Sequence, residues 1–432
     1  MNKKLAITVL LSILSMQSFA QEKQSIVKKG WTFGGLPSLS YSTDSGFQYG
    51  ICGNLYYYGD GTNYPRYQHM ISFEASHFTR GTTRLHLLFD TRAIDKFRII
   101  SALSYYDVPM AQLYGFNGSA TPYDPHLDAN LTYFAPDLGI SYYSYYKRFF
   151  RALTDVRYQI GRDLNLCFGF TYYAFGAKPM QKPQYKYGAT IYDDYVKYGL
   201  IRPDEAEGGN HLELKAGFSY DSRNHDSAPS KGMWADAFLL GSPALGSNYK
   251  YLQLNLHFRH YVPVPNEKFV FAYHLGFQGT ISGEAPFYIN QNISTVFLRN
   301  MISEGLGGCC TVRGILYDRM LGSSYAWANT EFRIRLFRFN LLNQSFYVAT
   351  SPLFDMGAIV KPYRLDDMLK LPENSSKTIA DLQKAATVLH TSAGLGFSLV
   401  MNENFVLIAE GAHPFRKEDG TLGINLGVNY TF

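Results

Sequence analysis

The chain is a series of short segments in which apolar and polar residues alternate, separated by turn residues. In the last segment, residues 422–432, every even position is apolar and every odd position is Gly, Asn or Thr. Residues 252–259 and 331–336 alternate in the same way, but their polar positions include Glu, His and Arg. Because successive side chains of a strand point to opposite faces, the pattern predicts strands with one apolar and one polar face. A charge-bearing inner face favours a wide, wet barrel lumen over the dry core of a soluble sandwich.

Counting these segments gives about sixteen strands. Four long connections, at about residues 110–138, 176–209, 283–323 and 358–388, all follow odd-numbered strands, whereas the connections after even-numbered strands are short. In bacterial outer-membrane barrels the long loops face outward and the short turns face the periplasm. The sequence therefore predicts an all-β fold, a transmembrane antiparallel β-barrel of about 16 strands of the outer-membrane type. The predicted strand centres lie near residues 37, 52, 72, 87, 103, 146, 169, 216, 236, 255, 275, 331, 350, 395, 408 and 427.

The first twenty residues have the pattern of a secretory signal peptide. Lys3 and Lys4 precede an apolar stretch, residues 5–16, and Ser18-Phe19-Ala20 supplies the small residues that signal peptidase needs. After this segment no apolar run of about 18 residues occurs, so the sequence predicts no membrane-spanning helix. We expect residues 1–20 to be removed on export and residues 21–432 to form one barrel domain in the outer membrane.

The composition agrees with this class of protein. The chain has 35 Tyr and 31 Phe but 3 Trp, and charged residues make up only 17%. Aromatic girdles at the two membrane interfaces give such a bias, and they imply outer-membrane lipid as a partner. The net charge of +5 is small and Lys and Arg are scattered, so we expect no nucleic-acid partner.

No set of residues predicts enzymatic chemistry or a metal or cofactor site. The histidines are scattered, and no G-x-S-x-G elbow is present. The four cysteines are Cys52, Cys167 and the adjacent pair Cys309-Cys310, which is too few and too irregular for a disulfide framework. We interpret them as small loop residues, and the role of Cys309 and Cys310 stays open.

Four motifs follow one another in the second half of the chain. They are Asp221-Ser222-Arg223 with Pro229-Ser230-Lys231-Gly232, Val312-Arg313-Gly314-Ile315, Asn329-Thr330-Glu331-Phe332-Arg333, and Phe354-Asp355-Met356-Gly357. In this order they resemble motifs of the Omp85 superfamily, a group of outer-membrane assembly factors and two-partner secretion transporters. The second resembles the V-R-G-(F/Y) tip of the family's sixth extracellular loop, with Ile315 in place of the aromatic residue. The fourth resembles an F-x-D-x-G segment of the thirteenth strand, here without the intervening residue.

The resemblance implies that an arginine clamps the sixth loop inside the barrel. In the family this arginine folds back into the lumen and pairs with acidic residues of the wall, and Arg313 is the matching residue here. Alternation places Glu331 and Asp355 on the inner face of neighbouring strands, where one guanidinium with five donors can bind both. Alternatively, these charges are ordinary lumenal groups that pair with water. The other motif residues at the clamp are Val312, Gly314 and Ile315 in the loop, and Phe354 and Gly357 on the strand.

The resemblance also implies a function in the assembly, insertion or translocation of outer-membrane proteins. The seam between the first and last strands would open sideways, and a client strand would add to its edge. Tyr430 and Phe432 resemble the C-terminal signal that barrels present to their insertion machinery. The chain resembles a branch without POTRA domains, so we expect client outer-membrane or secreted proteins and a separate periplasmic or lipoprotein partner. A passive pore and a structural subunit of a surface or assembly complex are the alternatives.

Overall fold

The structure is a computed structural model of the chain. It describes residues 27–432 except residues 43–45, 65, 119–122, 125–126, 128–141, 181–188, 245–248, 297–299, 304, 342–343, 367–368, 370–377, 385–387, 404, 429 and 431. The predicted signal peptide, residues 1–20, lies outside the described residues. All sixteen predicted strand centres lie within them.

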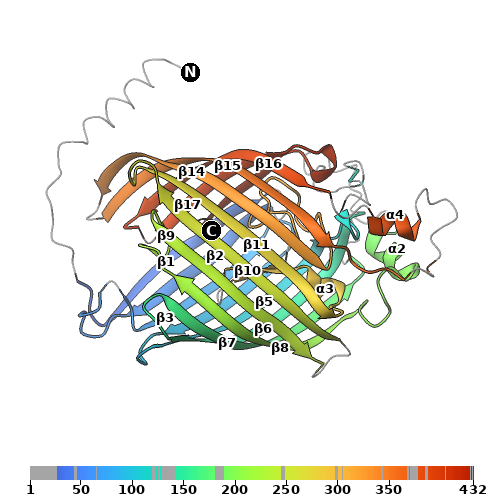
Figure 1. Cartoon of the computed structure of the whole chain (residues 1–432), viewed down its shortest axis with the longest axis horizontal. Helices are drawn as coiled ribbons and strands as arrows, with labels where there is room; N and C mark the ends of the chain where they lie inside the picture. Colours follow the sequence, from blue (N-terminus) through green and yellow to red (C-terminus); the bar gives the residue numbers. More distant parts are fainter. Residues whose placement is uncertain are drawn as a thin grey trace, which may run out of the picture.

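In the described part of the chain, sixteen strands close into one antiparallel barrel (Figure 1). Each predicted centre falls within one of these strands, so the predicted all-β fold and the strand number are confirmed. The first eight strands are β1 (Trp31–Ser42), β2 (Gly46–Tyr57), β3 (His69–Phe78), β4 (Thr83–Thr91), β5 (Phe97–Gln112), β6 (Ser144–Gln159), β7 (Leu164–Lys178) and β8 (Gly208–Asp221). The other eight are β9 (Gly232–Pro243), β10 (Lys250–Pro263), β11 (Phe269–Gly283), β14 (Ser324–Leu341), β15 (Gln344–Lys361), β16 (His390–Met401), β17 (Phe405–Pro414) and β18 (Gly423–Val428).

Neighbouring strands pair in chain order around the barrel, and the closing seam is the weakest join. β1 and β18 share two register pairs in the described residues, Tyr41↔Leu426 and Ser42↔Asn425. On its other edge β1 pairs with β2 over all twelve of its residues. The hairpin of β12 (Asn292–Val296) and β13 (Asn300–Ser303) is a separate two-stranded sheet inside the β11–β14 connection, so β11 pairs directly with β14.

The two faces of the wall follow the predicted alternation, and many polar side chains of the inner face are buried. On β10, Leu256 points outward and is 40% exposed, whereas His257 and Arg259 point inward and are buried. Arg259 donates to Asp236 of β9 at 3.1 Å, and both side chains are fully buried. Polar groups of the wall pair with one another and with the inserted loop between β11 and β14, because buried charges are costly unless they are paired.

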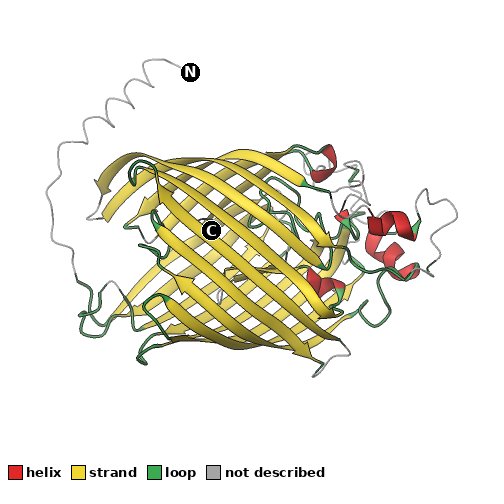
Figure 2. Cartoon of the chain, in the orientation of Figure 1, coloured by secondary structure: helices red, strands yellow, loops and turns green. Residues whose placement is uncertain are grey.

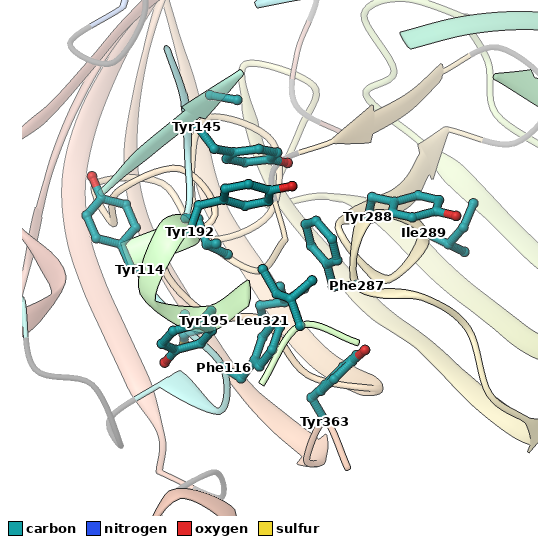
Figure 3. Packing of buried hydrophobic residues seen from close by; sticks show 14 of the residues in the cluster. Tyr114, Phe116, Tyr145, Tyr192, Tyr195, Phe287, Tyr288, Ile289, Leu321 and Tyr363 are labelled. Atoms are coloured by element: carbon teal, nitrogen blue, oxygen red, sulfur yellow. The ribbon is translucent and has the colours of Figure 1, made fainter. Parts of the chain in front are cut away.

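The four long connections meet in a cap at one end of the barrel, where Figure 2 shows most of the helical segments. The rings of Phe116, from the β5–β6 connection, and Tyr363, from the β15–β16 connection, stack with centroids 4.3 Å apart. The cap also contains Tyr192 and Phe287 from the other two connections (Figure 3). No helix in the described residues is long and apolar enough to cross a membrane. The helices are α2 (Ile191–Lys197), α3 (Phe287–Asn290) and α4 (Ile379–Lys384).

The end of the chain turns into the lumen, which corrects the prediction for residues 422–432. Ile424 and Leu426 point outward as predicted, but β18 ends at Val428. Phe432 is 6% exposed and packs in a buried cluster with side chains of β10 and β11. The guanidinium carbon of Arg333 lies 3.8 Å from the centroid of the Tyr430 ring. Arg333 also donates to the Phe432 backbone oxygen at 3.0 Å. A guanidinium stacked on aromatic rings is stabilising in a desolvated site, and this stack draws the last two aromatic residues away from lipid.

Candidate functional site at the tip of loop six

Loop six, residues 284–323 between β11 and β14, carries Arg313 at its tip into the barrel. The side chain is 2% exposed. Its Nε donates to Asp355 Oδ2 at 2.8 Å and its Nη2 to Asp355 Oδ1 at 2.8 Å, which is a bidentate pair. Its Nη1 donates to Glu331 Oε1 at 2.5 Å and to Glu410 Oε1 at 2.8 Å. The structure thus brings together the three residues that the sequence singled out and adds a fourth.

Glu410 is the residue that the sequence analysis missed. It lies on β17, whereas Glu331 lies on β14 and Asp355 on β15, so one guanidinium connects strands across a four-strand section of wall. Alternation on β17 places Glu410 on the same inward face as Val406 and Ile408, which are both buried. This pattern could have identified an acidic residue on the inner face. Its convergence with Glu331 depends on the barrel's curvature, which the period of two does not encode.

A second guanidinium completes the charge cluster and connects it to the chain end. Arg333, two residues after Glu331 on the same face of β14, donates from Nε to Glu331 Oε2 at 2.6 Å. The two carboxylate oxygens of Glu331 therefore serve different arginines. Because Arg333 also donates to the backbone oxygen of Phe432, the loop tip and the C-terminal tail share one buried network.

The surrounding charges set the ionisation of Arg313, which lies in loop six outside the membrane-spanning strands. Burial alone lowers the pKa of a guanidinium, but the negative charges of Asp355, Glu410 and Glu331 outweigh burial and hold the Arg313 pKa well above its usual value. The arginine therefore stays charged at every physiological pH.

Hydrogen bonds to the backbone of the tip fix its position along the wall. The Asn329 side chain, from the third motif, donates to the Thr311 carbonyl at 2.6 Å. Ser392 of β16 donates to the Arg313 carbonyl at 2.5 Å, and the Arg313 amide donates to Asp355 at 3.0 Å. The tip is thus held through its main chain by β14, β15 and β16, in addition to the guanidinium.

Glycines allow the tip to approach the wall this closely. A Cβ at Gly357 of β15 would lie 2.8 Å from Val312 Cγ2, so the motif glycine of the strand receives the motif valine of the loop. Gly314 has φ +86°, and a Cβ there would lie 2.7 Å from the carbonyl oxygen of Ala412 on β17. A Cβ at Gly423 of β18 would lie 2.7 Å from the Gly314 Cα. The tip therefore contacts the wall as far as the strand that forms the seam.

This contact predicts a position-specific effect of one methyl group. Gly314→Ala adds a Cβ against backbone at a left-handed φ, so we expect a loss of about 1–3 kcal/mol in the free energy of unfolding. Denaturant unfolding of the barrel in detergent micelles measures this loss. Gly411→Ala on β17 is the matched control, since a Cβ there meets nothing within 4 Å. Equal stability of the two variants would show that the tip does not occupy this position.

Ile315 and the cysteines are the remaining residues that the sequence singled out. Ile315, in the place of the family's aromatic residue, is 2% exposed and packs in the core of the cap. Cys309 and Cys310 lie in the loop with their Sγ atoms 3.0 Å apart, and the Tyr317 hydroxyl donates to Cys309 at 2.8 Å. The interpretation of all four cysteines as loop residues is wrong for the other two, because Cys52 lies on β2 and Cys167 on β7.

The chain is similar to known proteins in sequence family and in fold. Residues 112–432 match the Omp85 superfamily domain. The fold is similar to that of BamA from Haemophilus ducreyi lacking POTRA domains 1–3, with a TM-score of 0.55, 17% identity, and coverage of 93% of this chain and 70% of that chain. It is also similar to CdiB from Escherichia coli, with a TM-score of 0.56, 9% identity, and coverage of 94% of this chain and 64% of that chain. At these identities the structural likeness shows the fold alone. A sequence comparison with curated proteins gives no match.

Proposed function

This chain belongs to the Omp85 superfamily, and from that membership we propose that it acts in the outer membrane on other proteins, by inserting, translocating or displaying them. The mechanism is non-covalent and uses the edge of a strand. Client outer-membrane or secreted proteins are the substrates, and a separate periplasmic or lipoprotein partner delivers them. Tyr430 and Phe432 act earlier, as the signal by which the barrel itself is recognised for insertion.

The observation that carries this proposal is the seam. β1 has twelve residues, yet only Tyr41 and Ser42 have register partners on β18 in the described residues. An exposed strand edge offers a row of backbone donors and acceptors to an incoming strand. Opening the two pairs disrupts far less structure than opening any other join of the barrel, so a client strand adds here by β-augmentation.

The Arg313 cluster supports the same proposal as a clamp. It holds loop six inside the lumen through Glu331, Asp355 and Glu410, and the neighbouring Gly314 contacts Gly423 of β18. These contacts brace β14 to β17 as one body next to the seam. When the seam opens, the wall on this side keeps its shape while β1 and β18 separate.

The test is a quantitative outer-membrane proteome of cells that lack the protein and carry either wild type or Arg313→Ala. We expect a defined set of barrels or surface proteins to fall in the deletion strain and to recover with wild type only. Immunoblotting of the outer membrane verifies that the variant is inserted. An unchanged proteome would contradict the proposal, and steady conductance or stable co-purification with a fixed partner would then favour a pore or a structural subunit.

A further inference from the structure

The turn between β8 and β9, residues 222–231, reaches across the mouth of the barrel opposite the cap. Ala228 in this turn is 1% exposed and lies in a buried cluster with side chains of β15, β16 and β17. Along the wall, β10, β11 and β14 separate β9 from β15, so this contact crosses the lumen. The side chains in the cluster are Tyr347, Ala349, Val400, Val406 and Ile408.

The turn also contacts the wall on its other side. Asp226 accepts from Arg92 at 3.5 Å, and Arg92 lies in the turn between β4 and β5. β6 and β7 separate these two turns along the wall. The β8–β9 turn therefore spans from the β4–β5 turn to β15–β17, over the lumen between them.

Internal contacts make the turn a fixed unit rather than a loose loop. Arg223 donates from Nε and Nη2 to the Asp221 carboxylate at 2.8 and 2.7 Å. The guanidinium carbon of Arg223 lies 4.0 Å from the ring centroid of Trp234 on β9. The Asn224 side chain accepts from the amides of Ser230 and Lys231 at 3.1 and 3.2 Å. The first family-like motif thus sets the direction in which the turn leaves the wall.

The C-terminal tail lies beneath the same turn. Tyr430 packs against the Ala228 cluster, and its hydroxyl is 2.9 Å from that of Ser398 on β16. β18 ends at Val428, and in the described residues it shares two register pairs with β1 at the seam. The turn and Tyr430 of the tail are therefore in one packed cluster.

We propose that residues 222–231 are a lid that closes the periplasmic mouth of the lumen and keeps the C-terminal tail inside the barrel. The lid confines a client arriving from the periplasm to the seam, because the lumen offers it no entrance. It also keeps β18 short by holding Tyr430 in place. This consequence for clients rests on the proposed function, whereas the position of the lid does not.

The first experiment measures protection of the lid in the full-length barrel in outer-membrane vesicles. In a variant whose four native cysteines are serine, Ala228→Cys is compared with Lys231→Cys, an exposed position on the same turn. We expect a water-soluble maleimide to label position 231 rapidly and to leave position 228 unlabelled until the barrel is unfolded. Equal labelling of the two positions in the folded barrel would overturn the lid.

The second experiment displaces the lid. Ala228→Glu places a charge in an apolar cluster, whereas Lys231→Glu adds the same side chain in solvent. We expect conductance in planar bilayers to rise several-fold for Ala228→Glu alone, and a Tyr430→Cys tail to become labelled in that background. A folded Ala228→Glu barrel with wild-type conductance and a protected tail would contradict the proposal. If the lid behaves as expected but loss of the protein leaves the proteome unchanged, the lid stands and the client route fails.

Discussion

Replacing Arg313 with alanine will lower the free energy of unfolding by about 3–5 kcal/mol and release loop six from the lumen, because it leaves buried carboxylates without their cation. Asp355 loses its bidentate partner and Glu410 loses its ion pair, while Glu331 keeps Arg333. Denaturant unfolding measures the loss of stability. Protease cleavage within loop six on intact cells measures its release.

Two further variants distinguish the clamp from a simple loss of packing. Arg313→Lys keeps the charge but presents a single nitrogen, which cannot reproduce contacts to three carboxylates on three strands. We expect it to lie between wild type and Arg313→Ala. Adding Glu410→Gln to Arg313→Ala removes one unpaired charge, so we expect this double variant to regain part of the stability. Wild-type stability of Arg313→Ala would show that water satisfies the carboxylates.

Local pattern alone predicted the wall of the barrel. Alternation has a period of two in the chain and in the strand, so residues such as Leu256 and Arg259 indicate their faces without any knowledge of their neighbours. The position of Asp355 relative to Glu331 also follows, because consecutive strands are neighbours in an antiparallel barrel. Arg313 required the family resemblance, since nothing in its own loop shows that the side chain turns inward.

The features that the sequence did not predict all depend on contacts across the lumen. Phe432 continues the alternation of its strand in the sequence, yet its side chain is buried inside the barrel, where Arg333 on β14 donates to its backbone oxygen. Ala228 lies in an ordinary turn pattern, and its burial against β15–β17 depends on the width of the closed barrel. Such contacts join residues far apart in the chain, and the alternation of apolar and polar residues does not predict them.

A crosslink across the β1–β18 seam distinguishes a barrel that must open from one that stays closed. A disulfide between Tyr41→Cys and Leu426→Cys will abolish function, because these positions form a register pair across the β1–β18 seam. Cells that depend on this variant will show the client proteome of the deletion strain, and a membrane-permeant reductant will restore it. The measurement is made in a background with serine at the four native cysteines.

The matched control uses the same position of β1 and its other neighbour. Tyr41 pairs with Phe47 of β2, and both side chains point outward, with exposed fractions of 38% and 45%. A disulfide between Tyr41→Cys and Phe47→Cys therefore adds the same crosslink to the same strand without closing the seam, and we expect it to leave function intact. If both disulfides are tolerated, the seam does not open during function. Only the first disulfide joins β1 to β18. If both disulfides abolish function, the loss therefore results from restraining β1 and not from closing the seam.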